Sequence, residues 1–290
     1  MATASQVKAA AVRDYVGLAK PGSVAAHLVT AAAAMFLAAG GTPYPMRLLF
    51  TLVGGGLVAG GSNVLNCYLD RDLDALMART RRRALPAGRL EAGRALAFGV
   101  ALAIAGLLIL DRLVSPYAAG LAALALVYYV LVYTLWLKRR TAWSAVIGCA
   151  VGAFPPLVGW VAVTGGLTLT PFLLSAVIAL WTMPHVWALA LSRRGEYDGA
   201  GVAVPRTGVA VKATLAASVA LVGASLALAP AGGLGVLYWA VAGGAGLHFV
   251  YLAGRLWRDR PGAARRLYGY SIVYLVLLFG AVLADTLVFA

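Results

Sequence analysis

The chain is dominated by apolar segments of about 20 residues, and an α-helix of that length covers about 30 Å, the thickness of a bilayer's hydrocarbon core. Hydrophobic residues make up 62% of the sequence and charged residues 12%, whereas soluble domains have about 45–50% apolar and about 25% charged residues. We therefore predict an all-α integral membrane protein that forms a single domain over residues 1–290. Nine transmembrane helices are predicted, at approximately 22–40, 47–69, 95–114, 116–137, 143–164, 170–192, 212–230, 234–254 and 267–289.

The basic residues are distributed unequally between the two sides of the predicted bundle. If the N-terminus lies in the cytosol, 22 of the 24 lysines and arginines fall on the cytosolic side, and only Arg47 and Arg112 fall on the other. This asymmetry obeys the positive-inside rule, so we predict a multi-pass protein of the plasma membrane with a cytosolic N-terminus. The net charge of +14 then follows from topology and from attraction to anionic lipid headgroups. The bilayer is the expected partner, and nucleic acid is not.

Two predicted cytosolic loops, at about 70–94 and 193–211, carry six of the ten acidic residues. In the first, Asn66, Asp70 and Asp74 are spaced by four, so on a helix they line one face, while Asp72 points elsewhere. Oxygen-bearing side chains at a helix end in water suit Mg²⁺, which proteins hold with one or two carboxylates plus substrate phosphates. This spacing predicts a magnesium site on the cytosolic side.

Arginines follow the first acidic cluster, and a second acidic cluster occurs four spans later. Arg79 and Arg83 belong to the arginine-rich stretch after Asp74, and guanidinium groups bind phosphate in a bidentate manner. Glu196 and Asp198 follow the sixth span as the first cluster follows the second span. The acids and arginines could instead serve only to solvate loops and fix topology. Two matching loops favour a shared site for Mg²⁺ and a diphosphate.

The motif N-x3-D-x3-D resembles the first signature of the UbiA-type intramembrane prenyltransferases, and the chain is most similar to their protoheme IX farnesyltransferase (haem O synthase) branch. The resemblance implies a single nine-helix bundle with a central cavity open to lipid. It also implies that two or more Mg²⁺ ions hold an isoprenoid diphosphate at the two acidic loops, from which the prenyl group passes to an acceptor. The segments that carry the resemblance are 14–21, 70–90, 129–141, 152–165 and 181–191.

The resemblance also implies roles for particular residues. The expected metal ligands and catalytic residues are Asn66, Asp70, Asp74, Glu196 and Asp198, with Tyr197 as a further catalytic residue. Which of Glu196 and Asp198 binds metal is left open. The expected diphosphate contacts are Arg79, Arg83, Lys138, Arg139 and Arg194.

A prenyl carbocation needs a dry pocket with apolar and aromatic walls, because the face of an aromatic ring stabilises a nearby cation. The aromatic candidates could equally serve in helix packing or in an interfacial belt. The imidazole of His185 could ligate haem iron or carry a proton, or simply form a hydrogen bond to a neighbouring helix. The residues expected to contact the prenyl group or the acceptor are Tyr129, Tyr133, Ser144, Trp181, His185 and Trp187.

Three functions remain open at the level of sequence. The leading hypothesis is transfer of a prenyl group, with farnesyl diphosphate as donor and haem b as acceptor. Departures from the usual pattern of the branch, at Ala84, at Ser144, on both sides of His185 and after Gly201, motivate a paralogue that cyclises its prenyl chain or prenylates another aromatic acceptor. A transporter is disfavoured, because its coupling acids would lie near the membrane midplane and here they cluster at helix ends.

Overall fold

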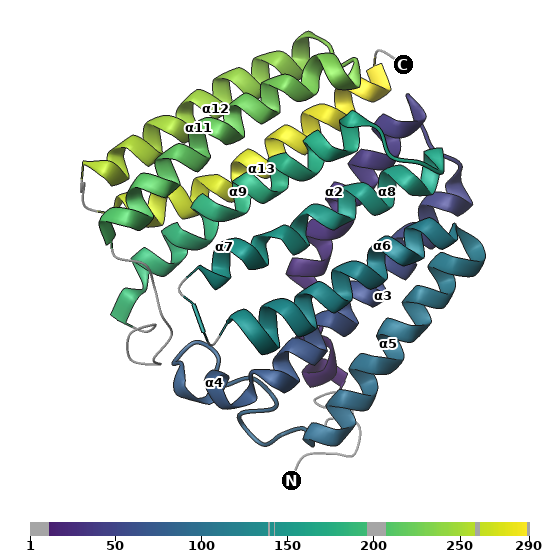
Figure 1. Cartoon of the computed structure of the whole chain (residues 1–290), viewed down its shortest axis with the longest axis vertical. Coiled ribbons are helices and arrows are strands. Elements are labelled where there is room, and N and C mark those ends of the chain that lie inside the picture. Colours follow the sequence, from purple (N-terminus) through teal and green to yellow (C-terminus); the bar gives the residue numbers. More distant parts are fainter. Residues whose placement is uncertain (1–11, 139, 142, 196–206, 259–261, 289–290) are drawn as a thin grey trace.

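The structure, a computed structural model, describes residues 12–138, 140–141, 143–195, 207–258 and 262–288, and this part of the chain is helical without any strand. Eight of the nine predicted runs form helical spans long and apolar enough to cross a membrane. They lie side by side in one bundle (Figure 1). These helices are α2 (Pro21–Ala39), α3 (Pro45–Leu69), α5 (Ala92–Leu113), α6 (Pro116–Val127) continued by η1 (Tyr128–Leu137), α9 (Leu169–Ser192), α11 (Thr207–Gly232), α12 (Val236–Trp257) and α13 (Ala263–Val288).

The one remaining predicted run, 143–164, consists of three short helices in place of one long one. These are α7 (Ser144–Gly148), the 3-10 helix η2 (Cys149–Ala153) and α8 (Phe154–Thr164). Pro155 and Pro156 are the second and third residues of α8 and have no backbone N–H to donate to a carbonyl one turn earlier, so the α-helical ladder cannot run unbroken from η2 into α8. Hydropathy predicts the apolar run but not this interruption.

The segment η1 is wound as a π-helix. Its i→i−5 pattern is seen in the bond of 2.9 Å from the Lys138 N–H to the Tyr133 carbonyl. The Thr134 hydroxyl likewise donates to the Tyr129 carbonyl at 2.8 Å. Most π-helices are single-turn bulges, and they are frequent at functional sites. A π-helix of ten residues is therefore unusually long, and its winding is of a kind found near functional sites.

Glycines bring neighbouring helix backbones together, as small residues do in lipid. A Cβ atom on Gly61 of α3 would lie 2.7 Å from the carbonyl oxygen of Gly99 on α5. A Cβ atom on Gly106 of α5 would lie 2.8 Å from the backbone nitrogen of Val58 on α3. We call this contact the α3–α5 glycine seam, defined by Gly54, Gly61, Gly99 and Gly106.

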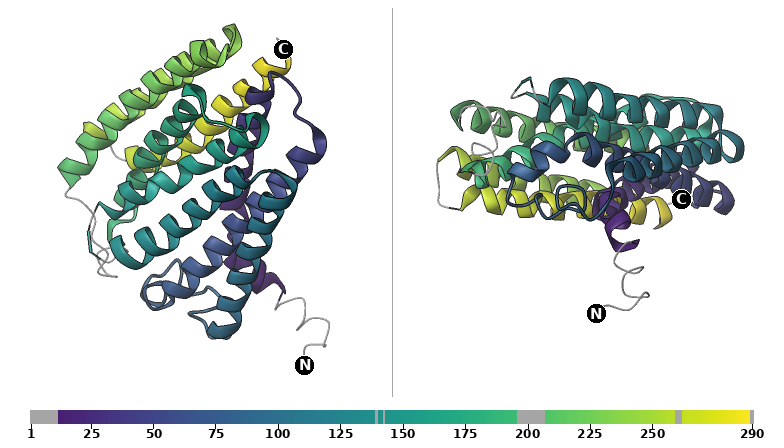
Figure 2. Two further views of the ribbon diagram at one scale, coloured as in Figure 1. Left: turned by 45° about the vertical axis from the view of Figure 1, so that its right-hand side comes forward. Right: turned by 90° about the horizontal axis from the view of Figure 1, so that it is seen from below.

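The helix ends predicted to be cytosolic lie at one end of the bundle, along the edge that runs from the left of Figure 1 to its bottom. They include the C-terminal ends of α3, η1, α9 and α12 and the start of α5, with the short helix α4 (Arg71–Leu76) beside them. Figure 2 shows from two further directions how the helices pack in the bundle. That this end faces the cytosol remains a prediction.

Candidate active site

Asn66, Asp70 and Asp74 continue one helical face across the junction between α3 and α4. The Asp70 N–H donates to the Asn66 carbonyl at 2.9 Å, and the Asp74 N–H donates to the Asp70 carbonyl at 2.8 Å. Asp70 is 1% exposed and Asp74 5% exposed, whereas Asp72 is exposed. The shared face is therefore as predicted. The expectation that these acids sit at a helix end in water is wrong, because both are covered.

Cations from other segments cover the two acids. Lys138, at the end of η1, places its Nζ 2.5 Å from Asp70 Oδ2. Arg83, in the loop after α4, places a guanidinium nitrogen 2.7 Å from Asp74 Oδ2. Buried charges need such partners, because an unpaired ion loses its hydration without compensation. We call these four side chains, together with Asn66, the acid–cation cluster.

The Asn66 side chain ties the cluster to two further residues. Its Nδ2 donates to Asp70 Oδ2 at 2.8 Å and to the Thr134 hydroxyl at 3.1 Å. Its Oδ1 accepts from Lys20 Nζ at 2.7 Å. Neither Lys20 nor Thr134 was expected in the site, because they lie 46 and 68 residues from Asn66 in the sequence.

Lys20 has an unusual backbone for a site residue. It is the N-cap of α2 with φ 52° and ψ 66°, and no other non-glycine residue of the described part has a positive φ. A left-handed non-glycine residue costs on the order of 1–3 kcal/mol and marks functional sites more often than others. Burial lowers the pKa of the Lys20 ammonium, and the positive charge of Arg83 acts in the same direction.

The cluster has the donors that Mg²⁺ prefers. The second carboxylate oxygen of Asp70, Oδ1, is buried and has no hydrogen-bond partner among the described residues. Among the described residues, no three His, Cys, Asp or Glu side chains lie close enough together to hold a metal ion. The acid–cation cluster therefore offers two carboxylates and one amide. That number suits Mg²⁺, which completes its shell with substrate phosphates and water.

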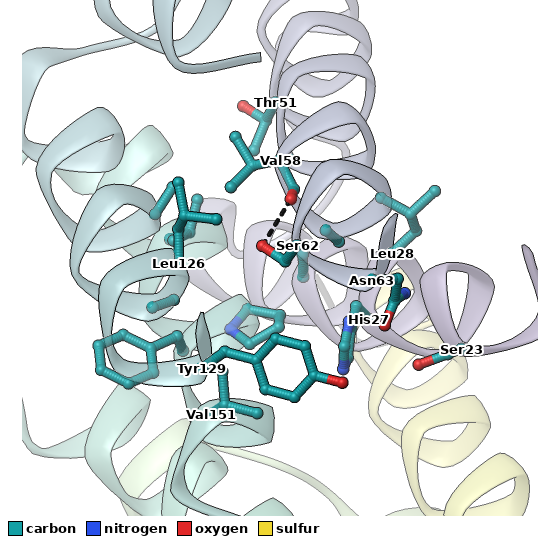
Figure 3. A pocket seen from close by; sticks show the side chains of 18 residues that line it. Ser23, His27, Leu28, Thr51, Val58, Ser62, Asn63, Leu126, Tyr129 and Val151 are labelled. Atoms are coloured by element: carbon teal, nitrogen blue, oxygen red, sulfur yellow. Dashed lines mark hydrogen bonds between the residues drawn. The ribbon is translucent and has the colours of Figure 1, made fainter. Parts of the chain in front are cut away.

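An apolar pocket lies between α2, α3, α6, η1 and α8 (Figure 3). Asn63, one helical turn before Asn66, lines it, and along α3 the lining continues to Thr51, a distance of about 18 Å at 1.5 Å per residue. Tyr129, one of the residues expected to contact the prenyl group or the acceptor, is in the wall. Figure 3 shows the ring of His27, which was not expected, near the Tyr129 hydroxyl. Tyr133 stacks on Tyr129, with ring centroids 5.6 Å apart.

Trp181 and His185 contact α13. Trp181 Nε1 donates to the carbonyl oxygen of Ser271 at 2.6 Å, and His185 Nδ1 lies 2.6 Å from the Ser271 hydroxyl. His185 is therefore hydrogen-bonded to a neighbouring helix, which was one of the roles left open for it. Trp187 is 1% exposed and Ser144 7% exposed, and Trp187 packs edge-on against Trp143.

The remaining predicted residues are not in the acid–cation cluster. Arg79 is exposed, and Arg194 bonds the Thr207 hydroxyl at the start of α11. Arg194 and Arg265 line a separate groove between the ends of α9, α11, α12 and α13. The other predicted residues lie outside the described part of the chain, and their roles stay predictions: Arg139, Glu196, Tyr197 and Asp198.

A multi-pass helical bundle, with buried carboxylates and cations at one end and an apolar pocket beside them, defines a membrane-embedded protein. The chain belongs to the UbiA prenyltransferase family, whose sequence model matches residues 27–282. A protoheme IX farnesyltransferase of Roseiflexus sp. (strain RS-1) is 43% identical over 98% of this chain. Another, from Gloeobacter violaceus, is 43% identical over 96% of this chain and 93% of its own length.

The chain spans about half of the Roseiflexus relative, 54% of its length. Among solved structures, a UbiA homologue from Aeropyrum pernix K1 superposes with a TM-score of 0.74 at 20% identity, covering 92% of this chain and 98% of that one. A UbiA homologue from Archaeoglobus fulgidus bound to GPP and Mg²⁺ has a TM-score of 0.66 at 13% identity, with coverage of 93% and 99%. These likenesses confirm the fold.

Proposed function

We propose that this chain is a Mg²⁺-dependent intramembrane prenyltransferase that ionises farnesyl diphosphate and transfers the farnesyl group to haem b, giving haem O. The observation that carries the proposal is the acid–cation cluster directly beside the apolar pocket, which suits a molecule with a diphosphate head and a hydrocarbon tail. The named activity of relatives at 43% identity supports the donor and the acceptor.

Asn66, Asp70 and Asp74 would hold Mg²⁺, joined by Glu196 or Asp198 from the second loop. The orphaned Oδ1 of Asp70 and the oxygen-only donor set fit this ion. Bound Mg²⁺ supplies Lewis-acid charge that favours departure of the diphosphate. The binding of GPP and Mg²⁺ by the Archaeoglobus homologue supports the assignment.

Lys138 and Arg83 have two tasks in this proposal. In the structure they neutralise Asp70 and Asp74, which keeps the buried acids compensated. When diphosphate occupies the site, the same ammonium and guanidinium groups donate to its oxygens and stabilise the charge that develops on the leaving group. Lys20, bonded to Asn66, adds a third cation on the opposite side of the amide.

The apolar pocket holds the prenyl chain and excludes water from the cation. A farnesyl main chain of twelve carbons extends over about 14 Å, taking about 1.25 Å of advance for each C–C bond of about 1.5 Å. The lining of α3 from Asn63 to Thr51 runs about 18 Å, which accommodates that length. Tyr129 in the wall offers a ring face to an allylic cation.

The active site is proposed to face the cytosol, in the plasma membrane. The 22 basic residues on that side support this orientation through the positive-inside rule. Labelling of single cysteines introduced at exposed Arg79 and at exposed Tyr117, at opposite ends of the bundle, tests it in sealed cells. Labelling of position 79 by an impermeant reagent added outside the cells would show that the orientation is the opposite of the one proposed.

The activity is tested with purified protein in lipid nanodiscs supplied with Mg²⁺, haem b and either farnesyl or geranylgeranyl diphosphate. We expect diphosphate release that requires both Mg²⁺ and haem, and a farnesylated porphyrin identified by mass spectrometry. Diphosphate release without haem, with a cyclic hydrocarbon as product, would show that the prenyl chain cyclises on itself and that haem is not the acceptor. Release that survives chelation of divalent ions would overturn the metal assignment.

A further inference from the structure

Ser271 of α13 joins two of the residues expected to contact the acceptor. It is 0% exposed, and its carbonyl oxygen accepts from Trp181 Nε1 at 2.6 Å. Its hydroxyl lies 2.6 Å from His185 Nδ1. One residue of α13 therefore holds two aromatic side chains of α9, one through its backbone and one through its side chain.

The hydrogen atoms of this contact can be counted. A serine hydroxyl carries a single proton, and the Ser271 hydroxyl donates it to the carbonyl oxygen of Tyr268 at 2.6 Å. A carbonyl cannot donate, so the direction of that bond is fixed. Toward His185 the Ser271 oxygen can only accept, and Nδ1 of the imidazole must therefore carry a proton. In the neutral ring, Nε2 is then unprotonated and keeps its lone pair.

Neighbouring rings and burial also fix the orientation of this imidazole. Trp181 stacks on His185 with centroids 4.5 Å apart and planes 22° apart, and Tyr268 lies 4.7 Å away with planes 33° apart. The Nδ1 edge meets a fully buried hydroxyl, yet His185 as a whole is only partly buried.

We propose that Ser271 is a positioning residue that holds His185 as the Nδ1–H tautomer, so that Nε2 presents a lone pair to the iron of a metalloporphyrin acceptor. Histidines that bind metals commonly donate their other ring N–H to an oxygen, which fixes tautomer and orientation, and here the Ser271 hydroxyl supplies that oxygen. The iron as target rests on the proposed function, whereas the tautomer rests on the hydrogen bonds alone.

The tautomer is tested by ¹⁵N NMR of histidine-labelled protein in nanodiscs without haem. The chain has three histidines, and the His185 signals are assigned by their loss in His185→Gln. We expect a protonated Nδ1 and an unprotonated Nε2 in the wild type, and a mixture of tautomers in Ser271→Ala. A protonated Nε2 in the wild type, or an unchanged pattern in Ser271→Ala, would overturn the proposal.

The role in acceptor binding is tested with the same variants by haem titration and steady-state kinetics. Loss of the outer partner of a metal-binding histidine lowers affinity about 10- to 100-fold, so Ser271→Ala should raise the haem Kd and the acceptor KM by that factor. The donor KM should not change, and Ser271→Thr, which keeps a hydroxyl, should restore both values. Ser218→Ala removes an equally buried hydroxyl, which donates within α11 to the Thr214 carbonyl at 2.7 Å, and should behave as the wild type.

Outcomes for Ser271 and for haem itself remain distinguishable. Equal haem affinity in Ser271→Ala and the wild type would overturn the positioning role. A wild-type protein that neither binds nor farnesylates haem would overturn the acceptor, and with it the iron as target, while the NMR pattern would still decide whether Ser271 sets the tautomer.

Discussion

Replacement of Asp70 by asparagine separates the structural task of this carboxylate from its catalytic one. In the structure Asp70 is 1% exposed and forms an ion pair with Lys138, whose side chain is 25% exposed. The variant keeps the shape of the side chain and loses its charge. Lys138 is then left without its counter-ion, and the proposed metal site loses one of its two described carboxylates.

The expected magnitudes follow from the burial of the two partners. Removing one member of a fully buried pair costs about 3–5 kcal/mol. Because Lys138 keeps a quarter of its side chain in contact with the surroundings, we expect a smaller loss of unfolding free energy, about 1–3 kcal/mol. The rate of diphosphate release should fall by about 10²- to 10³-fold, the usual effect of losing one group that stabilises transition-state charge.

A double variant makes the reasoning refutable. In Asp70→Asn/Lys138→Met both charges are gone, so the unfolding free energy in mixed micelles should return to within about 0.5 kcal/mol of the wild type. The rate should stay low, because neither the metal ligand nor the phosphate donor is restored. A double variant as unstable as Asp70→Asn would show that the unpaired Lys138 charge is not the cause of the lost stability, and full activity of Asp70→Asn would remove it from the metal site.

Asp72→Asn should leave diphosphate release close to that of the wild type, because Asp72 is exposed, whereas Asp74→Asn should lower it by about 10²-fold or more; equal effects would refute the shared-face argument. Lys20→Met should raise the KM for farnesyl diphosphate, and Lys20→Gly, which relieves the left-handed backbone, should raise it equally if the charge is what matters. Arg89 holds the pKa of Asp14 below its ordinary value of 3.8, so this pair stabilises the fold above that pH and the stabilisation is lost as the pH falls below it. The stability difference between wild type and Asp14→Asn, less than about 1 kcal/mol at pH 7, should disappear in acid unfolding measurements.

Much of the fold could be predicted because the bilayer imposes a length on each helix. Eight of nine apolar runs became single helical spans, and the four-residue spacing of Asn66, Asp70 and Asp74 placed them on one face. The interruption before α8 and the π-winding of η1 depend on local hydrogen bonding, to which a count of apolar residues is insensitive. A proline pair at 155–156 was the available signal for the first, and none was evident for the second.

Residue spacing predicted only the part of the site whose members are neighbours in sequence, and Lys138, 68 residues from Asp70, was expected from the family resemblance alone. Lys20 and Thr134 are bonded to Asn66 from 46 and 68 residues away in the sequence, and such contacts follow from how α2 and η1 pack against α3. His185 shows the same limit. Its bond to a neighbouring helix could be recognised only by locating Ser271, 86 residues further along the chain.

The α3–α5 glycine seam links substitutions between α3 and α5 to the geometry of the acid–cation cluster. Gly61 lies five residues before Asn66, about 7.5 Å along α3, and a Cβ there would meet backbone atoms of Gly99 and Ala103. Backbone cannot rotate away as a flexible side chain can, so any larger residue must push α3 and α5 apart. The loop that carries Arg83 is anchored on those same two helices. A single methyl group added at Gly61 would therefore alter the distance between the proposed metal ligand Asn66 and the proposed phosphate donor Arg83. Its effect would be measured as lost affinity for the diphosphate.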